Sequence, residues 1–298
     1  MKIAYLILVH NTPNHTKRLV SALSSNDAHI FIHLDKKVNC AEYHGLVGDN
    51  VHFISQRIPV HWGDFSQVEA ILNLLRMAMA QKPSFDRFVL LSGSDFPLRS
   101  TDYIEHFFNK HKGQEFINLV EMPSIIANKP LSRLTRYEPR VNGYNAGKFR
   151  RLFLKTCGSL LRLLRRDYKK AIGNMTPYAG SEWWALSREA CDYVFNFISE
   201  RPYFFEFYKN TVVPDESFFQ TIIGNSAISC NVARNLTFTD WSHGGSSPEN
   251  VTEKHIAHLK AVRTFPASDV YGPGEILFAR KFTDDSEELV GKIQRDLW

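Results

Sequence analysis

Two adjacent carboxylates, Asp215 and Glu216, follow a proline and precede an apolar run in the segment VVPDESFFQTIIGNS. A carboxylate in such a place can act as a general base, which takes the proton from an attacking hydroxyl. The same pattern is typical of a helix start, because free N–H groups and the macrodipole favour acids in a first turn. The segment alone favours helix capping and leaves the catalytic interpretation open.

Further polar residues follow the strands that the first half predicts. Val9 and His10 end the first apolar run, Asp35 ends the second, and Asp95 follows the run FVLLSGS. Ligands of parallel α/β sheets bind beyond the carboxyl ends of the strands, so we expect these residues on one rim. Asp35 has two open interpretations: a turn residue at the end of its strand, or an acid that binds the base or ribose of a nucleotide.

The elements that must position these residues alternate along the first half. Apolar runs and helical spacing predict strands over 2–10, 29–35, 51–55, 85–95 and 116–121, and helices over 14–25 with Asn14 as the cap, 64–81 and 101–111. Strands separated by helices of this length imply right-handed crossovers and a largely parallel sheet. In the second half, a strand is expected to pass into a helix at Ser187 or Arg188.

Several classes of protein are excluded by what the sequence lacks. The segment after the first strand, LVHNTPNH, has no glycine, and no G-x-x-x-x-G-K-[ST] segment occurs, which excludes the usual dinucleotide and P-loop fingerprints. The net charge of +5 is too weak, and its basic residues too confined to one segment, to indicate nucleic-acid binding. Four scattered cysteines without a C-x-x-C pair indicate a reducing compartment, and the first apolar run is too short to span a membrane. We therefore expect a cytoplasmic protein.

Residues 147–170 form the most basic segment of the chain, with apolar side chains on one side of the expected helix and arginines and lysines largely opposite. The favoured interpretation is a solvated helix packed on the core. A peripheral contact with an anionic membrane surface is the alternative.

Eight segments, taken in order along the chain, resemble the core-2/I-branching β-1,6-N-acetylglucosaminyltransferase family, which includes the peptide O-xylosyltransferases. They are AYLILVH, HIFIHLDKK, IPVHWGDFSQVEAILNLL, FVLLSGSDFPLRS, GSEWWALSRE, PDESFFQTI, TDWS and LFARKF. The resemblance implies a GT-A-like α/β fold, with a Rossmann-like, mostly parallel central sheet flanked by helices. It also implies a UDP-sugar donor and inversion at the anomeric carbon.

The resemblance assigns roles to individual residues. It implies that Glu216 is the catalytic base, since its family counterpart lies in the segment that reads PDESFF here, and that Asp215 orients or caps beside it. It places Val9, His10 and Asp35 at the uracil and ribose. The expected acceptor and cleft residues are Asp95, Glu121, Glu182, Trp183, Asp215 and Trp241, with Arg133 and Arg136 in a loosely corresponding region.

The leaving diphosphate needs a positive charge near it. No D-x-D triplet, which holds a metal ion in most GT-A enzymes, occurs in the chain, and basic side chains can replace the ion electrostatically. The resembling family uses two basic residues near its C-terminus, which implies Lys260 and Lys281, with Arg263 and Arg280 as near competitors. We therefore expect no metal and no cofactor besides the donor.

These expectations combine into one functional hypothesis: a metal-independent inverting glycosyltransferase that is one GT-A-like domain over 1–298. Residues 1–122 would bind the nucleotide-sugar and residues 123–298 would carry the acceptor and catalytic groups. The favoured donor sugar is N-acetylglucosamine, with xylose as the alternative. The acceptor is expected to be a glycan or lipid-linked glycan of bacterial surface polysaccharide synthesis, because the chain lacks the many cysteines of the animal enzymes. The rival hypotheses are an inactive carbohydrate- or nucleotide-binding protein and a metal-dependent transferase that uses Asp95.

Overall fold

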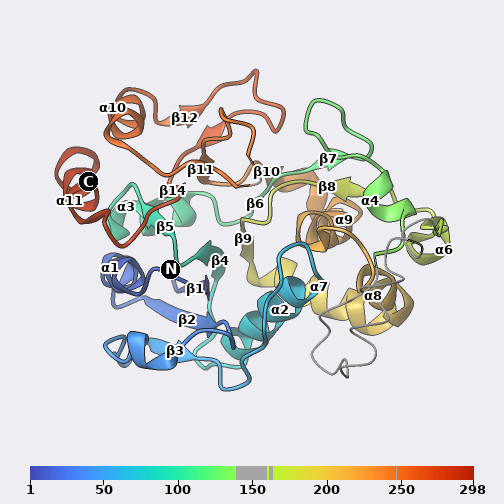
Figure 1. Ribbon diagram of the computed structural model, residues 1–298, viewed down its shortest axis with the longest axis horizontal. Helices are drawn as coiled ribbons and strands as arrows, with labels where there is room; N and C mark the ends of the chain where they lie inside the picture. Colours follow the sequence, from blue (N-terminus) through green and yellow to red (C-terminus); the bar gives the residue numbers. More distant parts are fainter. Residues whose placement is uncertain (139–159, 161–163, 246) are drawn as a thin grey trace.

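A twisted, mostly parallel sheet runs through the centre of the computed structural model, which describes residues 1–138, 160, 164–245 and 247–298 (Figure 1). In the described residues its strand order is β10-β6-β9-β4-β1-β2-β3. The strands are β1 (Ile3–Val9), β2 (Ala28–Leu34), β3 (Val51–Phe53), β4 (Arg87–Ser92), β6 (Glu115–Ile117), β9 (Trp184–Ser187) and β10 (Val232–Ala233). All pairs are parallel except those of β9, which runs antiparallel to both β4 and β6. The α/β class and the largely parallel sheet are thus confirmed.

Helices cover both faces of this sheet because alternate residues of the buried strands point to opposite sides. In β1, Ala4, Leu6 and Leu8 join one core with α2 and α7, whereas Tyr5 and Ile7 join another with α1 and α3. These helices are α1 (Pro13–Leu23), α2 (Ser66–Met79), α3 (Thr101–Lys110) and α7 (Arg188–Glu200). The Ser187 hydroxyl accepts the backbone N–H of Ala190, so α7 begins where the sequence predicts.

A smaller sheet joins the first half of the chain to its last third. Its strands, in the order β11-β14-β5, are β11 (Thr237–Thr239), β14 (Phe278–Arg280) and β5 (Asp95–Pro97). Helices α10 (Glu253–Ala261) and α11 (Glu287–Leu297) pack beside it around a third core, at the end of the molecule that also holds the C-terminus (Figure 1).

The expected single strand over 85–95 is wrong, because β4 ends at Ser92 and β5 belongs to the other sheet. The carboxylate of Asp95 accepts the backbone N–H of Ser92 at 3.0 Å, and the N–H of Gly93 binds the carbonyl of Leu8 at 2.9 Å. These bonds turn the chain between the two strands. The turn carries Asp95 out of the parallel sheet and toward β14.

Short elements complete the described part of the chain. They are β7 (Val120–Glu121), β8 (Tyr178–Ala179), β12 (Thr264–Phe265), β13 (Gly274–Glu275), α4 (Ser132–Thr135), α6 (Lys169–Ile172), α8 (Pro202–Tyr208), α9 (Phe218–Gly224), and the 3-10 turns η1 (Cys40–Tyr43), η2 (Pro214–Glu216) and η3 (Ala227–Asn231). The expected strand over 116–121 is therefore divided between β6 and β7.

Two further expectations about helices need correction. The cap of α1 is Thr12, in the left-handed conformation, and not Asn14, because Pro13 already supplies the first helical residue. The expected basic helix over 147–170 lies largely outside the described residues. Its described part is not helical over 164–168, where Arg165 forms a bridge with Arg136 and the Arg166 N–H binds the Thr135 carbonyl.

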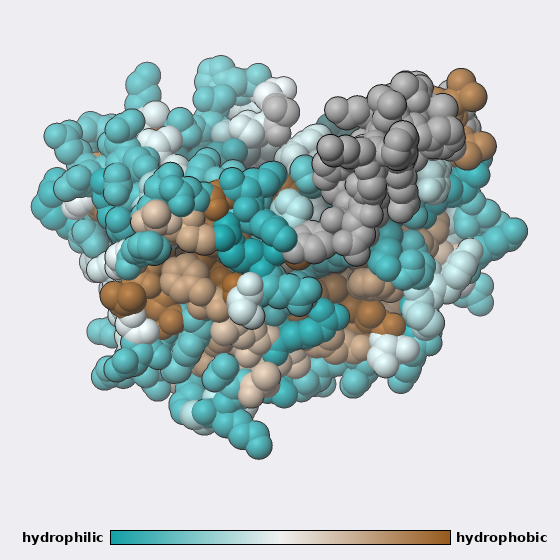
Figure 2. Space-filling view, turned by 60° about the horizontal axis from the view of Figure 1, so that its bottom comes forward, coloured by the Kyte–Doolittle hydropathy of each residue, from teal (hydrophilic) through white to brown (hydrophobic). Residues whose placement is uncertain are grey.

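Hydrophilic side chains predominate on the face shown in Figure 2, and apolar ones form separate groups between them. Trp62, Ile125 and Ile126 are among the most exposed large apolar residues of the described chain. None of the helices in the described ranges combines the length and the apolar character needed to cross a membrane.

One buried cation, Arg87 at the start of β4, ties the antiparallel strand to the rest of the large sheet. Its guanidinium is fully buried and donates to the carbonyls of His111, Lys112, Gln114 and Ala185. It also lies 3.7 Å from the buried carboxylate of Glu115. Replacing it would remove the donor from these four carbonyls and the counter-charge from the buried Glu115.

We expect Arg87→Met to lower the free energy of unfolding by about 3–5 kcal/mol, because the buried Glu115 loses its counter-charge. Urea denaturation at pH 7.5 measures the change. Arg295→Met, at an exposed position of α11, is the control and should shift stability by less than about 0.5 kcal/mol. Equal effects of the two substitutions would contradict the role given to Arg87.

Candidate active site

The paired acids lie in η2, a short turn that is fixed on both sides. Pro214 and Asp215 are buried, and the backbone N–H of Val213 donates to the carbonyl of Gly63 at 3.1 Å. The carbonyl of Glu216 accepts the N–H of Gly180 at 2.8 Å. The turn therefore holds the Glu216 side chain at a defined place while leaving it about one quarter exposed.

Glu216 is bound by two cations from the segment before and within α4. Lys129 Nζ lies 2.5 Å from Glu216 Oε2, and a guanidinium nitrogen of Arg133 contacts the same oxygen. The other carboxylate oxygen, Oε1, makes no hydrogen bond or ion pair within the described ranges. Burial lowers the pKa of Lys129, and the charge of Glu216 opposes that shift. The arrangement anchors the carboxylate through one of its oxygens.

The helix-start interpretation of the two acids is borne out in part, because both lie in the first turn of η2, which begins at Pro214. The following helix, α9, has Ser217 at its cap position, and neither it nor η2 receives a side-chain capping bond. Asp215 instead has a buried Oδ1 without a hydrogen-bond partner among the described residues. Burial, and the charges of Glu182 and Glu216, raise the pKa of Asp215 well above its usual value.

Glu182 adds a further acid to the same cluster. Its carboxylate accepts a hydrogen bond from the amide of Gln67 on α2. Burial raises the pKa of Glu182 to about 7, against the lowering effects of Gln67 and of the Arg280 charge. Glu182 therefore holds a proton over part of the neutral pH range.

Asp95 and Arg280 connect this cluster to the C-terminal strand β14. Asp95 is completely buried, and its Oδ1 lies 3.4 Å from Arg280 Nε. Burial raises the pKa of Asp95 to about 6, and the Arg280 charge limits the rise. The guanidinium carbon of Arg280 also lies 4.1 Å from the ring centre of Trp183, a cation–π contact. Trp183 is buried beneath this arginine, so packing and not an open sugar-stacking face is its role here.

Lys281 follows Arg280 and faces a polar cavity. Burial and the neighbouring Arg280 charge lower the pKa of Lys281, and Asp95 opposes that shift. Among the described residues its side chain has neither an ion pair nor a hydrogen bond. The cavity has a volume of about 320 Å³ and is lined by Asn11, Thr12, Ser94, Ser247, Pro248, Glu249, Asn250, Lys281, Phe282 and Thr283.

The same rim carries the residues at the carboxyl ends of β1 and β2. Loss of solvation lowers the pKa of His10, Asp35 opposes the shift, and Lys281 and Arg280 add to it, so all of these groups lie near one another. The structure thus brings the ends of β1, β2 and β4 close to η2 and β14.

A family model with the description "Core-2/I-Branching enzyme" matches residues 3–264. The chain belongs to the Core-2/I-branching enzyme family. The acids and cations described above lie in the matched part, except for Arg280 of β14 and Lys281, which follow it in the sequence.

Curated relatives of this Core-2/I-branching family member are xylosyltransferases. A xylosyltransferase of Ciona intestinalis is 24% identical over 324 residues, covering 100% of this chain and 34% of that protein. Xylosyltransferase 1 of Rattus norvegicus is 28% identical over 252 residues, covering 81% of this chain and 28% of that protein. The chain thus spans about a third of the length of these relatives. The crystal structure of apo mouse xyloside xylosyltransferase 1 aligns with a TM-score of 0.36 at 11% identity, over 93% of this chain and 97% of that one.

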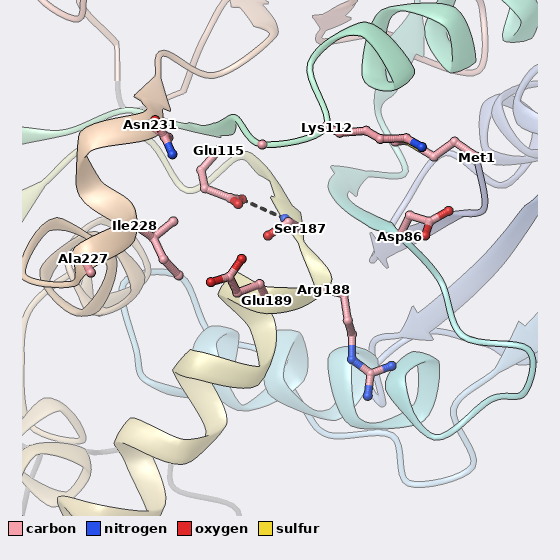
Figure 3. A pocket seen from close by; sticks show the side chains of 11 residues that line it. Met1, Asp86, Lys112, Glu115, Ser187, Arg188, Glu189, Ala227, Ile228 and Asn231 are labelled. Carbon is pink, nitrogen blue, oxygen red and sulfur yellow. Dashed lines mark hydrogen bonds between the residues drawn. The ribbon is translucent and has the colours of Figure 1, made fainter.

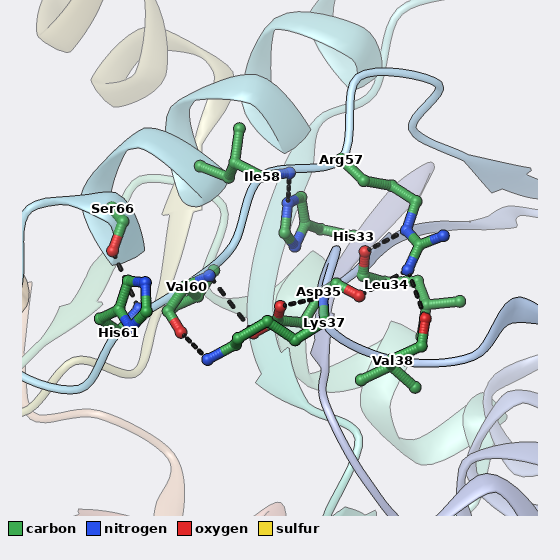
Figure 4. A network of polar contacts seen from close by, with 10 residues as sticks. All are labelled: His33, Leu34, Asp35, Lys37, Val38, Arg57, Ile58, Val60, His61 and Ser66. Carbon is green, nitrogen blue, oxygen red and sulfur yellow. Dashed lines mark hydrogen bonds and ion pairs between the residues drawn. The ribbon is translucent and has the colours of Figure 1, made fainter. Parts of the chain in front are cut away.

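Asp35 forms a turn at the end of β2 in this chain, which is one of the two interpretations that the sequence left open. Its Oδ1 accepts the Lys37 N–H at 2.8 Å, and its Oδ2 accepts the Val60 N–H at 3.3 Å (Figure 4). Arg57 donates to the carbonyls of Leu34 and Asp35 from the same network. These bonds join the segment before α2 to the end of β2.

Other predicted residues lie outside this cluster of contacts. Lys260 on α10 is exposed, and its Nζ lies 3.6 Å from Oδ2 of Asp296 on α11. Its counter-charge is therefore on the neighbouring helix. Arg263 lies near Arg99 and affects the pKa of that buried arginine. Glu121 accepts a hydrogen bond from the hydroxyl of Tyr178 at 3.4 Å, and Trp241 is half exposed in the loop after β11.

Sequence analysis missed three groups around the acids. Lys129 belongs to no recognisable motif. A tight turn through Asn128, which has a φ of 52°, brings Lys129 to Glu216. Gln67 lay in a helix with no other chemical signal. Tyr271, in the loop before β13, is the third: burial and the Glu216 charge raise the pKa of its hydroxyl to about 12.

Another cavity, of about 360 Å³, lies at the opposite, amino-terminal edge of the parallel strands (Figure 3). Its wall carries both signs of charge, including Lys112, Arg188 and Glu189, and none of the predicted site residues. Within the described ranges, histidine, cysteine and acidic side chains form no group of three or more suited to a metal ion.

We expect Glu182→Gln to change the pH dependence of stability. The pKa of Glu182 is about 7 in the folded chain and near 4.5 when unfolded, so the folded wild type binds more protons between these values. Wild-type stability therefore falls as pH rises from 5 to 7. The variant lacks this contribution, so its free energy of unfolding should rise by roughly 2 kcal/mol relative to that of the wild type across this pH range. Urea denaturation at pH 5 and pH 8 measures it, and a difference independent of pH would refute the assignment.

Proposed function

We propose that the protein is a metal-independent, inverting glycosyltransferase of GT-A-like fold that moves a sugar from a UDP-sugar to a hydroxyl of a glycan acceptor. The observation that carries the proposal is that Lys129 and Arg133 bind Oε2 of Glu216, whereas Oε1 has no partner among the described residues. Membership of the Core-2/I-branching family supports the same class of reaction.

Glu216 acts as the general base. The acceptor hydroxyl attacks the anomeric carbon while the bond from that carbon to the UDP oxygen breaks, and the bonding pair leaves with UDP. The hydroxyl proton passes to Glu216 Oε1, which is the oxygen without a partner among the described residues. Lys129 and Arg133 keep the carboxylate oriented through Oε2. Asp215 shapes the turn that presents it.

Arg280 and Lys281 stabilise the departing diphosphate. Negative charge develops on UDP as its bond to the sugar breaks, and preorganised positive groups in a partly buried site stabilise that charge most. Lys281 lines the polar cavity beside β1 and β4, and Arg280 is fixed by Asp95 and Trp183. Of the four basic candidates, these two lie nearest to the acids, and Lys260 is paired elsewhere.

The donor sugar is one of two candidates. Sequence resemblance to the family favours N-acetylglucosamine, whereas the names of the curated relatives favour xylose. We place Glu182, beside Asp215 and Arg280, at the sugar of the donor or the incoming acceptor. The acceptor is a glycan or lipid-linked glycan of bacterial surface polysaccharide synthesis.

Glu216→Gln should lower UDP-sugar turnover by at least 100-fold, because the amide keeps the shape and cannot take a proton. The measurement is release of UDP from a panel of UDP-sugars in EDTA, with UDP affinity determined in parallel by calorimetry. Glu288→Gln, at an exposed position of α11, is the matched control. Retained turnover in Glu216→Gln would refute its role as base. UDP binding without turnover in the wild type would favour the binding-protein alternative.

Lys281→Ala should weaken UDP binding by about tenfold or more, since a partly buried charge-assisted contact to the diphosphate is lost. Lys260→Ala is the matched lysine control and should alter the affinity less than twofold, because its side chain is exposed beside Asp296. Calorimetry with UDP in EDTA gives both values. A larger loss of affinity in Lys260→Ala than in Lys281→Ala would indicate that the diphosphate binds at α10. UDP binding that requires manganese would contradict metal independence.

A further inference from the structure

The segment before α2, residues 57–66, is fixed along its length but leaves one large aromatic side chain in solvent. The side chain of Trp62 is 78% exposed, whereas every other residue from Arg57 to Ser66 is at least partly buried. Tryptophan is usually highly buried in proteins, since its large apolar surface is costly to hydrate. The exposed indole is therefore available for contact with a ligand.

One end of this segment is bound to the rim that carries Asp35. The Val60 N–H donates to Asp35 Oδ2 at 3.3 Å, and Lys37 Nζ donates to the Val60 carbonyl at 2.5 Å (Figure 4). The N–H of His61 binds the Ser66 hydroxyl at 3.0 Å. Trp62 therefore follows directly on residues that are fixed at the proposed nucleotide end of the site.

The other end is bound to the turn that carries the proposed base. Gly63, next to Trp62, accepts the Val213 N–H at 3.1 Å, and the Val213 carbonyl accepts the Glu216 N–H at 3.3 Å. Gly63 has a φ of +69°, which favours glycine, so the bend at this position depends on that residue. Trp62 thus stands between the Asp35 rim and Glu216 on a segment that both sides hold rigid.

We propose that the indole face of Trp62 is the platform on which a sugar ring of the acceptor stacks. The inference rests on the proposed function, and it identifies the acceptor as a glycan that presents a pyranose ring to this position. The face of an aromatic ring is negative, which matches the partly positive C–H groups on one face of a sugar ring. A rigid platform loses little conformational entropy when the ligand binds, so a single ring contributes substantially to affinity.

The position of Trp62 favours the acceptor over the uracil of the donor. The acceptor must bring its hydroxyl to Glu216, and Gly63, next to Trp62, is joined to that turn through Val213. The uracil of the donor, in contrast, is expected at the ends of β1 and β2 near Asp35. Loss of Trp62 should consequently weaken glycan binding and leave UDP affinity within about twofold.

The test compares the wild type with Trp62→Ala and Trp62→Phe on an array of immobilised glycans, with UDP present at saturating concentration. Tyr203→Ala, which removes an exposed aromatic from α8, is the control. We expect the wild type and the Tyr203→Ala variant to capture the same glycans. Trp62→Ala should reduce their capture at least tenfold, and Trp62→Phe, which keeps an aromatic face, should retain most of it.

Three results would overturn the inference: no glycan captured by the wild type, equal capture by Trp62→Ala, or a drop in UDP affinity in Trp62→Ala that matches the loss of glycan capture. Calorimetry with UDP and the UDP-sugar turnover of the wild type separate this failure from that of the proposed function. A wild type that binds UDP and turns over a UDP-sugar while Trp62 proves neutral refutes the platform alone. A wild type that neither binds UDP nor turns over a UDP-sugar refutes the transferase itself.

Discussion

The ion pair between Asp95 and Arg280 joins parts of the chain that are far apart in sequence at the point where the site is built. The two residues are also backbone partners in the antiparallel pair of β5 and β14. This ion pair, the pairing of β5 with β14, and the bond from the Phe282 N–H to the Ser94 carbonyl at 2.8 Å together hold Arg280 and Lys281 beside the ends of β1 and β4. A fully buried carboxylate is costly unless a cation accompanies it, so the sheet and the site stabilise the same arrangement.

Loss of solvation around carboxyl groups dominates the electrostatics of the site. Asp95, Glu182 and Asp215 all have raised pKa values, and burial is the largest cause in each case. The Glu216 carboxylate is about one quarter exposed and is bound by Lys129 and Arg133.

Much of the fold could be predicted from the first half of the sequence, because buried strands and amphipathic helices there have clear periodicities. The ends of those strands correctly located His10, Asp35 and Asp95 on one rim. The break within 85–95 could not be predicted, since it depends on a side-chain bond from Asp95 and on pairing with a strand near residue 280. Lys129 was missed because a lone lysine has no pattern, and its position depends on a turn. Lys260 was favoured by alignment alone, which says nothing about the Asp296 partner on α11.

A crystal structure of the protein with UDP, grown in EDTA, tests the central claim most directly. We expect the diphosphate within hydrogen-bond distance of Lys281 Nζ and the Arg280 guanidinium, with the uracil at the ends of β1 and β2. We also expect Glu216 Oε1 to face the open space beside the terminal phosphate. UDP bound at another face, or bound at this site only through an added metal ion, would contradict it.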